Sequence, residues 1–221
     1  MNQTNFDTIQ HLFSEAGYIL SDAQIKDTLL YTEEITKWNK KINLTGAKTL
    51  EELMDHVVIS LSFQAFLDLH KNSAVLDLGS GGGFPGIPLK ISYPDLRIDF
   101  VDSRSKRVVF LKNVCRKLGF KNYNCFLARF EKLHTLLDPG FTYDCIVSRA
   151  VGDLFGIVKA SFDLLSFGGK WVVLKRDNPL SGTGELLQFF GENIEITTTR
   201  IPKSDHIGDN YTFLEIKKCS T

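Results

Sequence analysis

The sequence has no stretch of apolar residues that approaches the roughly 20 needed by a membrane-spanning helix. Its first segment, Met1–Ser14, is polar and lacks the basic start and apolar run of a secretory signal peptide. These two absences argue against a membrane or secreted protein. They predict a protein that stays in the cytosol.

Cysteine is scarce and scattered. The four cysteines are Cys115, Cys125, Cys145 and Cys219. They form no CxxC pair and no Cys/His pattern with the spacing of metal ligands. Cys125 and Cys145 fall inside apolar, strand-like runs, where cysteine packs as a small core residue. The sequence therefore predicts no metal site.

A net charge is also lacking, since 26 basic residues balance 26 acidic ones. This balance argues against a protein whose whole surface binds nucleic acid. The charges are segregated, however, because Asp102 is the only acid between Val101 and Lys121. The seven basic residues of that stretch are Arg104, Lys106, Arg107, Lys112, Arg116, Lys117 and Lys121. It forms either a basic face or an ordinary solvated helix surface.

The hydrophobic periodicity divides the chain into two regions. From Phe6 to about Leu69 apolar residues recur at helical spacing. Asp22 is the expected N-cap of a second helix, and Thr49 with Glu52 reads as a capping box that opens a third, ending near Leu69. We predict a helical extension over residues 1–70, packed on a core domain of residues 71–221.

From Ser73 onward, short β-like runs alternate with helical ones near 85–92, 104–118, 129–137, 151–166 and 183–190. The expected strands are Ala74–Leu78, Arg97–Val101, Tyr123–Leu127, Cys145–Ser148, Trp171–Lys175, Glu192–Thr199 and Tyr211–Ile216. Such alternation predicts an α/β fold with a doubly wound, mostly parallel, seven-stranded sheet. The last two strands have no room for a crossover helix between them and should pair antiparallel.

A turn rich in glycine follows the first strand, at the edge where α/β sheets bind ligands. The dinucleotide pattern GxGxxG is formally met from Gly81 to Gly86 but starts two residues late. Counted from the strand end, the pattern is Asp77-x-Gly79-x-Gly81-x-Gly83, and Phe84 stands where a third dinucleotide glycine belongs. The alternative is a tight turn that only caps a helix.

The carboxylate of Asp77 distinguishes the two cofactors. It can accept hydrogen bonds from the cationic amino group of a methionine, directly or through water, whereas it would repel a pyrophosphate. The turn therefore favours S-adenosylmethionine over NAD.

Polar residues also follow the next three strands. Asp102 can hold the ribose hydroxyls that both cofactors carry, while Asp99 should point to the other face of the sheet. Phe130 is expected either against the adenine or in the core. Arg149 follows the fourth strand, the position that faces the transferable methyl group and the acceptor in methyltransferases.

Taken together, these motifs resemble the bacterial 16S ribosomal RNA guanine-N7 methyltransferases of the RsmG family, also called glucose-inhibited division protein B. The resemblance spans about residues 38 to 176. The matching segments are Trp38–Gly46, Asp77–Pro88, Val101–Arg107, Phe110–Leu111, Arg129–Glu131 and Ser148–Val151.

The resemblance implies a class I, Rossmann-like methyltransferase that uses S-adenosylmethionine. It places the cofactor against Gly79, Phe84, Phe130, Glu131 and Arg149, and makes the acceptor N7 of one guanosine in 16S ribosomal RNA. The partner would be that RNA or the small ribosomal subunit.

Three positions depart from the family pattern. Phe130 stands where the family usually has Ala, and Ile59 replaces the acid of the His-apolar-apolar-Asp-Ser-Leu segment. Near the C-terminus, Gly208–Tyr211 stands where a Glu-Arg-His-like segment is expected. The last departure bears on RNA contact and catalytic aid from that segment, not on the cofactor site.

Methylation at guanine N7 needs no general base, because N7 carries an available lone pair. The protein must align N7, the methyl carbon and sulfur, and such positioning contributes roughly 7–11 kcal/mol. The sequence lacks the Asn/Asp-Pro-Pro-aromatic segment of amino-methylating enzymes and the Pro-Cys nucleophile of C5 methylation. Arg149 and Lys175 are the candidates for a catalytic role beyond positioning the base. Lys175 is expected to reach O6 or a phosphate, or else to be an exposed strand-end lysine.

The expected RNA-binding residues are Arg104, Arg107, Arg116, Lys175 and Arg176, with Lys40 and Lys41 as further candidates. Such phosphate contacts weaken steeply with salt. Three alternatives remain open: a small-molecule methyltransferase, an NAD-dependent oxidoreductase, and a non-catalytic RNA-binding protein. The sequence shows no obligate protein partner or oligomeric state. It does not separate naked RNA, the 30S particle and an assembly intermediate as substrate.

Overall fold

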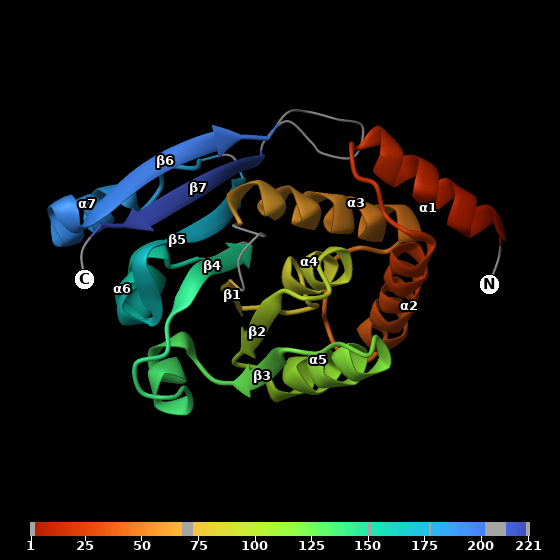
Figure 1. Ribbon diagram of the computed structural model, residues 1–221, viewed down its shortest axis with the longest axis horizontal. Helices are drawn as coiled ribbons and strands as arrows, with labels where there is room; N and C mark the ends of the chain where they lie inside the picture. The colour runs from red at the N-terminus through yellow and green to blue at the C-terminus, as the bar shows by residue number, and fades with distance from the viewer. Residues whose placement is uncertain (1–2, 68–72, 150–151, 177, 202–210, 220–221) are drawn as a thin grey trace.

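A seven-stranded sheet forms the centre of the computed structural model (Figure 1), which describes residues 3–67, 73–149, 152–176, 178–201 and 211–219. Its strands are β1 Ala74–Leu78, β2 Arg97–Asp102, β3 Tyr123–Leu127, β4 Tyr143–Arg149, β5 Leu165–Arg176, β6 Ile194–Arg200 and β7 Tyr211–Lys218. They lie in the order β3-β2-β1-β4-β5-β7-β6. Of these strands, β7 alone runs in the opposite direction to the other six. The predicted fold class and the antiparallel final pair are confirmed.

Helices cover both faces of the sheet (Figure 1). One face carries α1 Gln3–Glu15, α2 Asp22–Asn39, α3 Leu50–Leu61, α4 Gly86–Ser92 and α5 Ser105–Lys117. The other carries α6 Leu154–Ser161 and α7 Thr183–Phe190. Four 3-10 helices are η1 Ser62–Phe66, η2 Phe130–Leu136, η3 Phe162–Leu164 and η4 Gly191–Asn193. Strand β1 is buried along its whole length, as expected of a central parallel strand covered on both sides.

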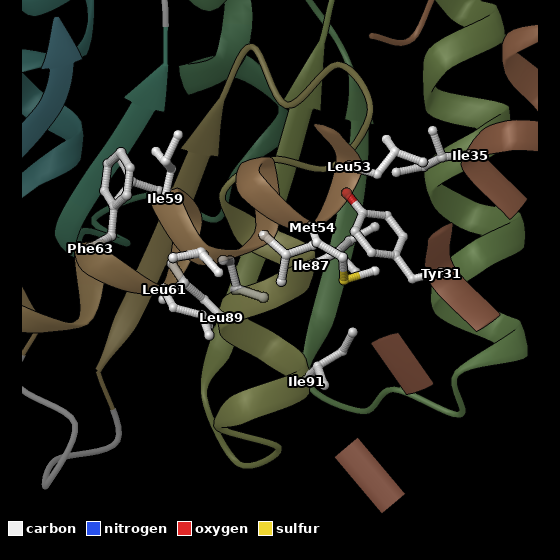
Figure 2. Close-up of a cluster of buried hydrophobic side chains, with 14 of the residues drawn as sticks. Tyr31, Ile35, Leu53, Met54, Ile59, Leu61, Phe63, Ile87, Leu89 and Ile91 are labelled. Carbon is white, nitrogen blue, oxygen red and sulfur yellow. The ribbon is translucent and has the colours of Figure 1, made fainter. Parts of the chain in front are cut away.

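The N-terminal helices share one hydrophobic core with the sheet. Figure 2 shows side chains of α2, α3 and α4 gathered together, with Met54 of α3 close to Tyr31 and Ile87. Such burial contributes about 1.5–3 kcal/mol for each large apolar side chain. The predicted boundary near residue 70 lies outside the described residues, so the division into 1–70 and 71–221 stays a prediction.

Several element ends differ from the sequence prediction. Asp22 is not the N-cap of α2, because the Ser21 hydroxyl accepts a hydrogen bond from the Gln24 amide and the Gln24 side chain caps Ser21 in return. Helix α3 ends at Leu61 and continues as η1 instead of running to about residue 69. Helix α6 is shorter than the predicted 151–166, since β5 already begins at Leu165.

None of the described helices is both long and apolar enough to cross a membrane.

Candidate functional site

A hollow of about 390 Å³ opens at the carboxyl ends of β1–β4, the edge at which α/β sheets bind ligands. Five of the eight predicted cofactor residues line it: Gly79, Asp102, Phe130, Glu131 and Arg149. The other three, Asp77, Gly81 and Phe84, are not among its lining residues. The topology thus brings together residues that are up to 70 positions apart in the sequence.

The glycine turn after β1 folds back over the end of β2. The amides of Gly79 and Ser80 both donate to the Val101 carbonyl, and the Gly81 amide donates to Asp102 Oδ2 over 3.0 Å. Asp102 Oδ1 accepts the Arg104 amide over 2.8 Å. These bonds orient the Asp102 carboxylate, which is 4% exposed, and they leave it lone pairs for further donors. Gly81 therefore acts on the hollow through Asp102.

Asp77 lies fully buried at the end of β1. Its Oδ2 accepts the Gly86 amide over 3.0 Å, whereas its Oδ1 has no hydrogen-bond partner within the described structure. Burial raises the pKa of this carboxyl to about 7, against the opposing effects of the Gly86 amide and the Arg149 charge. A buried oxygen without a donor is costly, and a donor bound beside it would be stabilised.

Arg149, at the end of β4, reaches across to α3. Its Nη1 donates to the His56 carbonyl and to Ser60 Oγ, both over 3.3 Å, and its Nη2 lies 2.8 Å from His56 Nδ1. The Phe84 ring lies beneath the pair, with its centroid 5.4 Å from the guanidinium carbon and 5.3 Å from the imidazole centroid. Phe84 thus supports Arg149 from behind the hollow.

His56 is held neutral by this arrangement. Burial and the nearby Arg149 charge lower its pKa to about 4. Because Nδ1 faces the guanidinium donor, Nδ1 is the acceptor and Nε2 carries the proton. Sequence reasoning did not select His56 or Ser60 as site residues. The available signal was their i, i+4 spacing, which places two polar side chains on one face of an apolar helix.

Comparison with known proteins decides the family. The family model described as rRNA small subunit methyltransferase G (GidB) matches residues 24–188. The chain belongs to this family. Ribosomal RNA small subunit methyltransferase G of Geotalea uraniireducens is 35% identical over 99% of both chains. The protein of that name from Bacillus cereus strain B4264 is 30% identical, over 90% of this chain and 85% of the relative.

Solved structures share the fold at lower identity. An rRNA methylase from Streptococcus thermophilus has a TM-score of 0.54 at 16% identity, over 75% of this chain and 97% of that chain. A Streptococcus mutans protein described as a methyltransferase and solved in complex with SAH has a TM-score of 0.52 at 15% identity, over 72% of this chain and 97% of that chain. These likenesses, together with the family match, make the protein a methyltransferase with a class I fold.

Ile59, the position expected to depart from the family pattern, lies beside the Arg149–His56 pair. Ile59 is 4% exposed, one residue before the Ser60 that binds Arg149. Within the described part of the chain no acidic side chain forms an ion pair with Arg149, although its side chain is largely removed from water. This chain therefore holds the family's arginine with neutral groups.

The remaining predicted cofactor residues lie as follows. Phe130 lines the hollow and also packs against the core on the α6 face, so its predicted core environment is present and its contact with adenine stays a prediction. Glu131 is exposed at the rim. Asp99 lies on the opposite face from Asp102, as predicted, where it accepts hydrogen bonds from Tyr143 and Asn124.

Lys175 and Arg176 lie on opposite faces of the sheet, because neighbouring residues of a strand alternate. The Lys175 ammonium donates to the Ser181 carbonyl before α7, and Lys175 lines neither the cofactor hollow nor the hollow beside Arg176. Arg176 lies on the α3 face, beside His56 and Tyr211. Lys175 and Arg176, both predicted to bind RNA, therefore lie on two different surfaces.

Basic side chains surround a second, open hollow of about 500 Å³ near the start of α5. Lys41, Arg104, Lys106 and Arg107 line it. Arg107 also contacts a residue of the hollow at the strand ends, since its Nη1 lies 3.4 Å from Asp102 Oδ2. Arg116, near the end of α5, is exposed but does not line this hollow. Among the described residues, no group of three or more His, Cys, Asp or Glu side chains is placed to hold a metal ion.

Proposed function

We propose that this protein transfers a methyl group from S-adenosylmethionine to N7 of one guanosine in 16S ribosomal RNA, and that it does so in the cytosol, where that RNA is found. The observation that carries the proposal is the family match over residues 24–188, which contains every residue lining the hollow at the strand ends.

Arg149, which lines the hollow, and Asp77, buried at the end of β1 behind its lining, fit the amino-acid part of this cofactor. Asp77 offers a buried oxygen without a donor, which suits an ammonium group. Arg149 offers a guanidinium without an ionic partner in the described structure, which suits a carboxylate. Asp102 would hold the ribose hydroxyls, and Phe130 and Glu131 would lie along the adenine. The cofactor supplies a methyl group made electrophilic by a positively charged sulfur.

The protein's own contribution is positioning without proton transfer. Guanine N7 already carries its lone pair, so the site needs no general base. A neutral His56 suits such a site, because a second cation beside Arg149 would oppose the positive charge that develops on the methylated base. The Arg149–His56 pair, supported by Phe84, would border the side of the hollow at which an acceptor arrives, and would thereby help to orient the base.

The direct test is transfer of radiolabelled methyl to ribosomal RNA from cells that lack the enzyme, with mapping of the modified nucleotide. Incorporation at a single guanosine, in a form that aniline cleaves after reduction, is expected of N7 methylation. Naked RNA, 30S particles and assembly intermediates should be compared as substrates. Cofactor binding with no transfer to any of them would favour a non-catalytic RNA-binding protein.

The basic hollow near α5 is proposed to contact the RNA backbone, because its lysines and arginines converge from two segments of the chain. Exchanging exposed Lys41 and Lys106 for Glu is expected to weaken RNA binding. It should also reduce the slope of log K against log salt by about 0.7–0.9 for each phosphate group that the variant no longer neutralises. Affinity for the cofactor should stay unchanged, since neither residue touches the cofactor hollow.

Lys26→Glu is the matched control for each of the single variants Lys41→Glu and Lys106→Glu, because Lys26 is exposed near the other end of α2. Arg107 is unsuitable for this test, since charge reversal beside Asp102 is expected to weaken cofactor binding as well. Equal loss of RNA affinity in Lys26→Glu would assign the effect to net charge and not to this hollow.

A further inference from the structure

A third hollow, of about 280 Å³, adjoins the Arg149–His56 pair, since His56 lines this hollow and Arg149 lines the cofactor hollow. It lies over the carboxyl end of β5, against α3 and the loop before it. Its walls include two carboxylates, Glu52 and Asp55, together with His56, Arg176 and Tyr211. Pockets that hold small ligands measure about 300–1,000 Å³, so a hollow of this size suits a group no larger than one nucleobase.

The two hollows share a wall. Arg149 lines the cofactor hollow and is bound to His56, which lines the third hollow. The Tyr211 hydroxyl is near enough to influence the pKa of Arg149, and Arg176 is near enough to lower that of His56. An acceptor in the third hollow would therefore lie against the same pair of side chains that borders the cofactor hollow.

Flat and apolar surfaces in this hollow suit a planar ring. Arg176 and Tyr211 face each other across β5 and β7, with the guanidinium carbon 5.1 Å from the ring centroid and Nη2 donating to the hydroxyl over 3.1 Å. A base stacks well on such a pair. Gly46 lies in the loop opposite, and a Cβ added at this position would have no atom within 4 Å. The hollow therefore has room at that side.

The carboxylate of Glu52 gives the hollow its selectivity. Glu52 lies one helical turn before His56 and influences its pKa. Its Oε2 accepts the Lys48 amide over 2.6 Å, which fixes the side chain. A carboxylate accepts hydrogen bonds and donates none. It therefore matches the N1–H and N2–H donors of guanine and not the corresponding edge of adenine, although both purines have an N7.

We propose that the third hollow receives the flipped-out target base and that Glu52 selects guanine through its N1 and N2 donors. This assignment rests on the proposed methyl transfer to guanine N7. N7 lies on the opposite side of the purine from N1 and N2, so a base held by Glu52 would present N7 away from Glu52, where the Arg149–His56 pair borders both hollows. Extrusion of a base from its stack costs a few kcal/mol, least in an unpaired loop.

The test compares guanine with inosine, which keeps N7 but lacks the N2 amino group. Two 16S fragments are used, one with guanine and one with inosine at the mapped target position. The rate of methylation of each is measured under single-turnover conditions for the wild type and for Glu52→Gln. The methylation rate of the wild-type protein is expected to be about tenfold lower on inosine than on guanine. The rate of Glu52→Gln on guanine should be about tenfold to a hundredfold lower than that of the wild type, as for loss of a bidentate base contact. The ratio of the methylation rate on guanine to that on inosine should fall toward one in Glu52→Gln, because only the wild type binds the N2 amino group through a carboxylate.

Folding and cofactor binding are controlled in the same experiment. The glutamine oxygen can still accept the Lys48 amide, and Thr49 still caps α3 by accepting the backbone amide of residue 52. Affinity for SAH by calorimetry should therefore be unchanged. Glu51→Gln is the matched control, since Glu51 is the exposed neighbour that does not line the hollow. An equal guanine-to-inosine ratio in wild type and Glu52→Gln would overturn the assignment while the proposed function stands. A wild-type protein that methylates no small-subunit RNA would overturn both.

Discussion

Asp77→Asn is expected to weaken S-adenosylmethionine binding roughly tenfold to a hundredfold, the usual range for one hydrogen bond to a charged group. The Asp77 carboxyl has one oxygen bound to the Gly86 amide and one without a donor in the described structure. Asparagine keeps an acceptor for Gly86, but it cannot offer a negative charge to an ammonium group. The loss should appear in binding of SAH by calorimetry as well, because SAH has the same amino-acid part.

The same substitution is expected to stabilise the free protein at high pH. Folding raises the pKa of Asp77 to about 7 from its ordinary value of 3.8. Between these values the unfolded chain has released its proton while the folded chain still holds it, so the wild type loses stability as the pH rises. Above pH 7 the full cost is present, on the order of 4 kcal/mol. Asparagine carries no such cost.

Two pH series check this prediction. In urea unfolding without ligand, the stability of Asp77→Asn relative to wild type should increase from pH 5 to pH 8. In calorimetry, cofactor affinity of the wild type should fall by up to tenfold per pH unit below pH 7, because the carboxyl must lose its proton to pair with the ammonium. The variant should lack this dependence. Unchanged cofactor affinity in Asp77→Asn would give Asp77 a structural role alone, through Gly86.

The sheet could be predicted from the sequence because its signals are local. Val75 and Leu76 belong to a continuous apolar run, which is typical of a central parallel strand, and the glycine turn marks its end. Element ends depend on weaker forces. Ser21 rather than Asp22 caps α2 because Gln24 completes a reciprocal pair, and neither residue alone reveals the choice. Leu165 joins β5 because it pairs with Tyr143, a long-range contact.

The hollow at the strand ends was predictable for a similar reason, while its role as the cofactor site stays a proposal. Residues that follow successive parallel strands meet at one edge, so Asp102, Phe130 and Arg149 could be grouped from strand positions alone. His56 could not be placed there, because nothing in the sequence shows that α3 packs across the end of β4. Tyr211 likewise reaches the third hollow only through the pairing of β7 with β5.

Gly86→Ala is expected to lower the free energy of unfolding by about 1–3 kcal/mol, the usual cost of overpacking a core. Gly86 is the first residue of α4, where alanine would ordinarily favour the helix. A Cβ at this position would lie 2.5 Å from Phe100 Cε1 and 2.6 Å from Asp77 Oδ2. Both neighbours are fully buried, so neither can move aside without displacing the strand that carries it. The displaced Asp77 carboxyl should also weaken cofactor binding.

Gly184→Ala is the matched control, since it makes the same change inside α7, where nothing lies within 4 Å of the added methyl group. It should stabilise the protein by about 0.5–1 kcal/mol, because alanine loses less backbone entropy than glycine in a helix. The measurement is the urea midpoint of both variants at one pH, with SAH affinity alongside. If Gly86→Ala matched Gly184→Ala in both stability and affinity, then the close contact among Asp77, Gly86 and Phe100 would not be what orients the buried carboxylate.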